Sequence, residues 1–106
     1  MIIVTGTATA SRETLAEMIR ISLEHVRRSR TEEGCISHNV HIDCENPMRL
    51  MFFEQWADEE TLRKHFALPE SRKFARLLRE LAVPATDIPD RVPDRMDVYD
   101  ATKVRV

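Results

Sequence analysis

The middle of the chain brings two aromatic side chains, a carboxylate and an imidazole into a short stretch of sequence: Phe52, Trp56, Glu54 and His65. Phe52, Glu54 and Trp56 alternate along an expected strand and therefore share one of its faces. A carboxylate between two aromatic rings on a face that is to be buried needs a partner, a pocket water or a raised pKa. His65 lies near the inward side of the helix that follows. These residue types predict a mostly apolar pocket that suits a flat aromatic ligand.

The same residues also fit an ordinary protein core. In that interpretation Glu54 pairs with an arginine, Trp56 packs among core side chains and His65 is a partly exposed helix residue. Taken alone, the residues favour this core interpretation over the pocket.

The four histidines and two cysteines show no metal-binding pattern. His38 and His41 lie three positions apart on an expected strand, so they project to opposite faces and do not share an ion. His41 and Asp43 share a face, but the sequence identifies no third ligand and has no Cys-x-x-Cys or His-x-x-x-His spacing. We therefore expect no metal site.

Sequence motifs for organic cofactors are missing as well. The only glycines are Gly6 and Gly34, so the chain has no glycine-rich phosphate loop and no recognisable site for NAD, FAD or ATP. Cys35 opens a strand without a helix N-terminus to lower its thiol pKa, which favours an inert thiol over a nucleophile. We expect no cofactor.

Length and composition limit the class of protein. A chain of 106 residues corresponds to one domain, which we take as residues 1–106. With 42% hydrophobic and 32% charged residues it is neither membrane-like nor disordered, and a net charge of -2 disfavours nucleic acid as a partner. No segment approaches the roughly 20 apolar residues of a membrane span, and residues 1–6 lack the features of a signal peptide. We therefore expect a cytoplasmic protein without a membrane partner.

Hydrophobic periodicity predicts four strands and two helices. They are a strand over residues 1–8, a helix from Ser11 to about Arg30, strands over residues 35–43 and 49–56, a helix from Asp58 to about Ala82 and, after a proline-rich loop, a strand from about Arg95 to Val106. Ser11 and Asp58 are expected to cap the helices, and Gly34 to stop the first one in the left-handed conformation. Pro69 should split the second helix, with Ser71 as a new cap.

The order strand, helix, strand, strand, helix, strand predicts an α+β domain with the ferredoxin-like βαββαβ arrangement and an antiparallel sheet. Right-handed crossovers place both helices on one face of that sheet. Both faces of the third strand are apolar, however, with Leu50, Phe52 and Trp56 on one and Met51 and Phe53 on the other. The face without helices needs a cover, and a second subunit is the economical one. We therefore expect a homodimer whose sheets pack face to face into a dimeric α+β barrel.

Five short segments, in their order along the chain, are similar to one known family. They are Glu32-Glu33-Gly34-Cys35, His41-Ile42-Asp43, Glu45-Asn46-Pro47, Phe53-Glu54-Gln55-Trp56 and Leu62-x-x-His65-Phe66-Ala67-x-Pro69. Over about residues 1–82 the chain resembles the antibiotic biosynthesis monooxygenase domain, in particular its quinol-monooxygenase-like branch. The resemblance implies a dimeric α+β barrel that oxygenates electron-rich aromatics, such as anthrones or hydroquinones, with O₂ and without flavin, haem or metal.

The resemblance also implies roles for individual residues. By position, Trp56 and His65 match the family's pocket residues and Glu54 its strand carboxylate. His65 would accept a proton or donate a hydrogen bond to the developing oxyanion, since an imidazole pKa of about 6.5 suits either task. Trp56 and Phe52 would stack on the substrate ring. Further candidate substrate contacts are Phe66, beside His65, and Asn39 and His41, on the face of the second strand that looks toward the dimer barrel.

Departures from the family pattern keep other functions open. After Pro69, where the family often has a histidine or an aromatic residue, this chain has Glu70-Ser71-Arg72-Lys73. Haem degradation is disfavoured, because the relatives that degrade haem carry a tryptophan at the position of His65 and an asparagine in the first strand. One alternative is a non-catalytic barrel that binds small aromatics. Another is an isomerase acting on a small phosphorylated or hydroxylated signal metabolite, with Arg72 and Lys73 as the anion contact.

Overall fold

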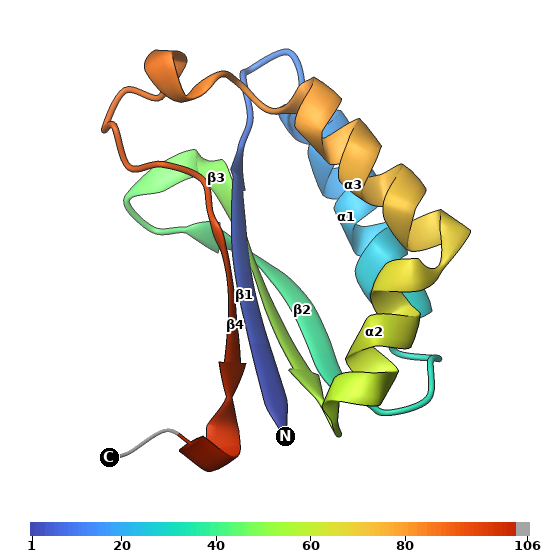
Figure 1. Cartoon of the computed structure of the whole chain (residues 1–106). Coiled ribbons are helices and arrows are strands. Elements are labelled where there is room, and N and C mark those ends of the chain that lie inside the picture. Colours follow the sequence, from blue (N-terminus) through green and yellow to red (C-terminus); the bar gives the residue numbers. More distant parts are fainter. Residues whose placement is uncertain (104–106) are drawn as a thin grey trace.

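The computed structural model describes residues 1–103 and shows a four-stranded antiparallel sheet with three helices against one of its faces (Figure 1). The elements are β1 (Ile2–Thr9), α1 (Leu15–Ser29), β2 (Cys35–Asp43), β3 (Asn46–Trp56), α2 (Glu59–Ala67), α3 (Pro69–Leu81) and β4 (Met96–Asp100), with short 3-10 turns at Ala85–Asp87 and Ala101–Lys103. The strand order β2-β3-β1-β4 confirms the predicted ferredoxin-like α+β fold. None of the helices in this part of the chain is long and apolar enough to cross a membrane.

The helix-facing side of the sheet carries the core, because alternation along the strands sends every second side chain there. Leu50 and Trp56 of β3 and Val4 of β1 are buried, and Met18 and Val26 of α1 are fully buried above the sheet. Each fully buried side chain of this size contributes roughly 1.5–3 kcal/mol. This layer therefore fixes the position of α1 relative to the strands that carry the candidate residues.

The opposite face of the sheet has no helix across it in the described part of the chain (Figure 1). Met51 and Phe53 of β3 are half-buried on that face, and Tyr99 of β4 is exposed there. The second apolar face that alternation along β3 predicted is therefore present. The second subunit expected to cover it stays a prediction.

Two helix starts differ from the expectation. The first helix, α1, begins at Leu15 rather than just after Ser11, because Ser11 and Thr14 bond to each other in a preceding turn, with the Ser11 N–H donating to Thr14 Oγ1 at 2.9 Å. The second helix is split at Pro69 as predicted, but Ser71 does not cap the second piece. Pro69 itself occupies the first turn of α3, where its missing N–H breaks no helical bond.

The last two strands also differ in extent from the expectation. The strand β3 begins at Asn46 instead of Arg49, because the hairpin turn is shorter than the turn-forming residues suggested. The strand β4 ends at Asp100, where a 3-10 turn begins. The expected continuation of this strand to Val106 lies outside the described residues.

Candidate functional site

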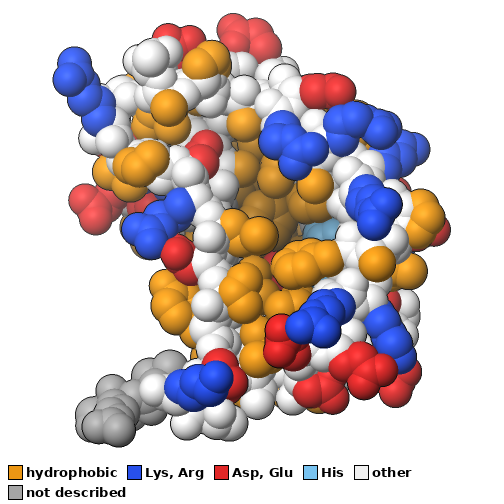
Figure 2. Space-filling model, viewed as in Figure 1, with side chains coloured by type: hydrophobic (Ala, Val, Ile, Leu, Met, Phe, Trp, Pro, Cys, Tyr) orange, Lys and Arg blue, Asp and Glu red, His pale blue; other side chains and the backbone are white. Residues whose placement is uncertain are grey.

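A cavity of about 430 Å³ is lined by the helix-facing side of the sheet and by all three helices. Figure 2 shows a hollow among hydrophobic side chains, with a histidine surface in its depth. The apolar lining includes Phe52, Phe66, Phe74 and Met96, and the buried ionisable lining consists of His25, His38, Glu54 and His65. An apolar cavity with a few convergent polar groups is typical of a small-molecule site.

His65 of α2 is oriented by a carboxylate from the segment before β2. Its Nδ1 lies 2.8 Å from Oε1 of Glu32, and only 2% of its side chain is exposed. Because an ionised carboxylate only accepts hydrogen bonds, Nδ1 carries the proton and Nε2 keeps its lone pair on the side of Glu54. Burial lowers the pKa of His65, while the hydrogen bond to Glu32 opposes that shift. The neutral ring near pH 7 is therefore available as a proton acceptor.

The chain around Gly34 brings Glu32 close to His65. The N-cap of α2 is Asp58, as predicted, and its carboxylate accepts from the Thr61 N–H at 2.8 Å. Gly34, directly before β2, has a φ of 81°, and a Cβ at this position would collide with the side chain of Thr61. The left-handed conformation expected at Gly34 is confirmed, but Gly34 does not stop the first helix, because α1 ends at Ser29 with Arg30 as its C-cap. The lack of a side chain at Gly34 instead lets the start of β2 lie against the first turn of α2.

Trp56 holds the carboxyl group of Glu54 and is not part of the cavity wall. Its Nε1–H donates to Oε1 of Glu54 at 3.0 Å, its side chain is completely buried, and its ring packs against His65 with the centroids 4.6 Å apart. Burial raises the pKa of Glu54 to about 7, and the hydrogen bond from Trp56 partly opposes the rise. With its side chain completely buried, the Trp56 ring has no face open to a ligand in this structure, whereas its N–H is placed to hold the Glu54 carboxyl group.

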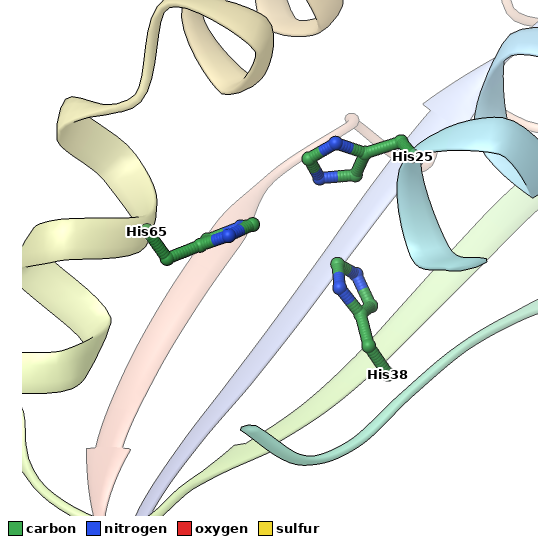
Figure 3. Close-up of side chains that lie close together, drawn as sticks. All are labelled: His25, His38 and His65. Carbon is green, nitrogen blue, oxygen red and sulfur yellow. The ribbon is translucent and has the colours of Figure 1, made fainter. Parts of the chain in front are cut away.

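Three buried histidines from three elements converge in the cavity lining: His25 of α1, His38 of β2 and His65 of α2 (Figure 3). The ring centroid of His25 is 5.2 Å from that of His38 and 5.2 Å from that of His65. The other two centroids, of His38 and His65, are 5.8 Å apart. Burial and the neighbouring imidazoles lower the pKa of His25 to about 2 and that of His38 to about 3. All three rings are therefore uncharged near pH 7.

The cavity brings together some of the site residues predicted from sequence and leaves others outside. The predicted residues in its lining are Phe52, Glu54, His65 and Phe66, and those outside it are Trp56, Asn39 and His41. Asn39 and His41 alternate with the buried His38 along β2, so they lie on the open face of the sheet, as expected. There the Asn39 Oδ1 accepts from Nη2 of Arg30 at 2.9 Å. A ligand confined to the cavity does not reach them.

The basic pair that the isomerase alternative required does not line this cavity. Arg72 is exposed, and Lys73 borders a separate hollow that α1 and α3 line. Arg79 and Arg95 are the arginines that border the cavity within residues 1–103. The anion contact on which the isomerase alternative depended is therefore not formed by the expected residues.

Sequence reasoning missed Glu32, His25 and His38 as site residues, although a usable signal was present for two of them. His25 precedes Val26 in the apolar stripe of the first helix, and His38 shares the buried face of β2 with Val40. Histidines on the buried faces of separate elements are candidates for one cluster. Glu32 lies in a loop, where no periodicity applies, and only its place in the family-like segment Glu32-Glu33-Gly34-Cys35 marked it.

Together the fold and the cavity define a class of protein: a ferredoxin-like α+β domain whose apolar cavity contains a buried histidine bonded to a carboxylate. The sequence model of the antibiotic biosynthesis monooxygenase family matches residues 1–77. The chain belongs to this family, which confirms the resemblance drawn from its motifs.

Solved structures with the same fold come from several organisms. A candidate antibiotic biosynthesis monooxygenase of Deinococcus radiodurans has a TM-score of 0.84 at 24% identity, with 100% of this chain and 97% of that one covered. A conserved protein of Methanosarcina mazei Go1 has a TM-score of 0.80 at 24% identity, with 92% and 89% covered. At these identities the likeness shows the fold alone.

A relative from Synechocystis sp., an uncharacterised protein, is 29% identical over 87 residues. The matched region is 82% of this chain and 59% of the relative. This chain thus spans somewhat more than half the length of that relative.

Proposed function

We propose that this protein is a monooxygenase that oxidises an electron-rich aromatic substrate, such as a hydroquinone or an anthrone, with O₂ in the cavity. Membership of the antibiotic biosynthesis monooxygenase family supports the reaction class. The observation that carries the proposal is the hydrogen bond from the buried His65 to Glu32, because it leaves an imidazole nitrogen free in the lining of a mostly apolar cavity. A proton acceptor is thereby placed beside the space in which an aromatic ring would bind.

The first step of the proposed reaction is transfer of a substrate proton to Nε2 of His65. Glu32 accepts the hydrogen bond from Nδ1–H and stabilises the imidazolium that forms, as the carboxylate of a catalytic triad does. The substrate anion then supplies electrons to O₂ directly. One oxygen atom enters the substrate, and the other leaves as water with two substrate hydrogens. The substrate is thus the source of all the electrons, and no organic cofactor is required for the balance.

Glu54 and the aromatic walls have the supporting roles. With a pKa raised to about 7, the carboxyl group of Glu54 is protonated in a substantial fraction of molecules at neutral pH and donates to the developing oxyanion. Trp56 fixes that carboxyl group by its hydrogen bond. The walls formed by Phe52, Phe66 and their neighbours exclude water, which strengthens these interactions.

Oxygen uptake with a panel of dihydroxynaphthalenes and anthrones tests the proposal. The wild-type protein should consume O₂, and His65→Gln should lower kcat by about 100-fold or more, as loss of a general base does. Lys64→Gln changes the exposed neighbour on the same helix and should leave turnover unchanged. Binding of these aromatics without O₂ uptake would overturn the proposal and favour the non-catalytic alternative.

We further infer that the working unit is a homodimer of single-domain chains. The open face of the sheet supports this inference, because Met51, Phe53 and Tyr99 leave apolar surface there. Two such sheets packed face to face, about 10 Å apart, would bury these side chains between them in the manner of a β-sandwich. The two cavities would lie on the outer, helix-covered sides of the dimer.

A further inference from the structure

We propose that His25, His38 and His65 bind a divalent transition-metal ion beside the cavity, with the carboxylate of Glu54 as the fourth ligand. Imidazole nitrogen and carboxylate oxygen are donors that Zn²⁺, Fe²⁺ and Co²⁺ accept, whereas Mg²⁺ and Ca²⁺ prefer oxygen alone. This inference departs from the sequence-based expectation of no metal site. It does not rest on the proposed function. An ion bound by Nε2 of His65 and by Glu54 would occupy the two groups that the proposed oxidation uses, so that reaction belongs to the ion-free protein.

The spacing of the rings supports the site. One ring nitrogen from each of the three histidines lies within 4.8 Å of the other two. In a tetrahedral site with metal–nitrogen distances of about 2.1 Å, ligand nitrogens are roughly 3.4 Å apart, so no separation needs to shorten by more than about 1.4 Å. The three rings stand on separate elements of one packed core and point toward a common space (Figure 3), so the site is largely preformed.

His38 is a buried ligand without another partner. Its side chain is 1% exposed, yet neither ring nitrogen has a hydrogen-bond partner within residues 1–103. Buried polar groups in folded proteins are nearly always paired, because an unpaired one costs free energy. Coordination of an ion by Nε2 would satisfy this side chain, which faces the other two rings.

Glu54 completes the set of ligands. Its carboxylate oxygens lie 3.6 Å from Nε2 of His38 and 3.7 Å from Nε2 of His65. Both distances are too long for hydrogen bonds, but they are close to the roughly 3.4 Å that separates two ligand atoms on one ion. The hydrogen bond from Trp56 holds the carboxylate in place. Glu32 does the same for His65, because its bond to Nδ1 leaves Nε2 free to coordinate.

Arg28 opposes metal binding at His25. Its Nη2 lies 2.6 Å from Nδ1 of His25, and a guanidinium only donates, so the neutral ring carries its proton on Nε2. Coordination through Nε2 requires the other tautomer, and the half-buried guanidinium must then turn away. Removing the charge of Arg28 should therefore tighten ion binding, which is an effect specific to this geometry.

All four ligands line the cavity, so a bound ion would border the space proposed for the substrate. The four protein ligands fill a tetrahedral site, so a hydroxyl or phenolate oxygen of an aromatic ligand would bind only as a fifth ligand, by the expansion to five-coordinate geometry that Zn²⁺ permits. The class of ligand expected at such an ion is therefore an aromatic with at least one hydroxyl group.

The test uses untagged protein that has been freed of metal with a chelator and is then titrated with Zn²⁺ and with Co²⁺. We expect one ion per chain by calorimetry, visible d–d bands of bound Co²⁺, and a Tm that rises with the ion concentration. His38→Gln should weaken binding by more than about 100-fold, because loss of an outer partner alone costs roughly 10- to 100-fold. His41→Gln is the matched control, since it removes an exposed histidine outside the cluster, and it should leave the affinity unchanged.

Arg28→Gln supplies a test that does not depend on the folding of a ligand variant, since we expect it to raise the affinity for Zn²⁺. Absence of stoichiometric binding to the wild-type protein, or equal losses in His38→Gln and His41→Gln, would overturn the inference. Oxygen uptake with the aromatic panel is measured in parallel on chelated and Zn²⁺-loaded protein. Ion binding without oxidation in either form would remove the proposed function alone, and oxidation without ion binding would remove this inference alone.

Discussion

The carboxylate of Glu32 and the imidazole of His65 form a hydrogen bond of 2.8 Å, although 33 positions separate them in the sequence. The bond fixes the tautomer of a buried ring in the cavity lining. Both proposals depend on its consequence, which is that Nε2 is free to accept a proton or to coordinate an ion.

Replacing Glu32 with glutamine keeps the length of the side chain but removes its charge. The pKa of His65 should fall further, because Glu32 is the group that raises it against burial. We expect kcat for aromatic oxidation to drop about 100-fold, at the lower end of the range for general acid–base catalysis. NMR titration of the His65 ring checks the pKa without a substrate. Glu33→Gln changes the exposed neighbour, and equal effects of both variants would contradict the assigned role.

Trp56→Phe removes the indole donor to Glu54 and keeps an aromatic ring in the core. The pKa of Glu54 should rise above about 7, since the bond from Trp56 is what lowers it. Loss of a buried hydrogen bond should also reduce the free energy of unfolding by roughly 1–3 kcal/mol. Carbon-13 NMR of the Glu54 carboxyl group measures the first effect and urea unfolding the second. An unchanged Glu54 pKa in a folded variant would show that the two groups do not interact.

Gly34→Ala should destabilise the protein by more than about 1–2 kcal/mol, which is the cost of the left-handed conformation alone for a residue with a Cβ. The new methyl group would in addition collide with Thr61 and move the start of β2 away from α2. Gly6→Ala is the control, because a Cβ there meets Arg95 O at an ordinary 3.8 Å, and its effect should stay below about 1 kcal/mol. Urea unfolding compares the two, and similar losses of stability would argue against the packing described at Gly34.

Asp90 should make the stability of the protein sensitive to acid. It forms two hydrogen bonds with the buried Arg49 guanidinium, at 2.7 and 3.0 Å, and this pairing lowers the pKa of Asp90 to about 2. Because the folded-state pKa lies below the ordinary value of about 3.9, the stabilisation is complete above that pH and is lost as the pH falls toward 2.

We therefore expect Asp90→Asn to lower the free energy of unfolding near neutral pH, and the difference from the wild-type protein to disappear as the pH falls through about 2. Urea unfolding across this pH range is the measurement. Asp87→Asn changes an exposed residue of the same segment, for which residues 1–103 supply no basic partner, and should show no such pH dependence. A difference between Asp90→Asn and wild type that persists at the lowest pH would contradict the ion-pair explanation.

Phe53→Lys should convert the expected dimer into a monomer, because it puts a charge in the centre of the open sheet face. Light scattering should report twice the 12.3 kDa of the chain for the wild-type protein and the single-chain mass for the variant. Val92→Lys replaces an exposed hydrophobic residue outside the sheet and should leave the mass unchanged. A wild-type protein that is monomeric at all concentrations would rule out the dimer.

Local patterns were sufficient for the order of the elements and for part of the cavity. Alternation along β3 predicted that Phe52 and Glu54 face the helices, and helical spacing predicted that His65 turns inward, and all three line the cavity. Helix starts were less predictable, since Ser11 has the residue type of a cap but is used in a turn with Thr14. Cap preferences act over a few residues and do not decide between neighbouring candidates.

The sequence by itself determined the α+β fold, the family and the two-sided apolar character of β3, because periodicities of 2 and 3.6 residues show which side chains share a face. Only the tertiary structure decided which faces meet. The packing of α1 and α2 on the sheet joined His25, His38 and His65 into one cluster, and the turn at Gly34 gave His65 its carboxylate partner. These contacts depend on how whole helices and strands are placed relative to one another. The spacing of residues within a single helix or strand does not predict that placement.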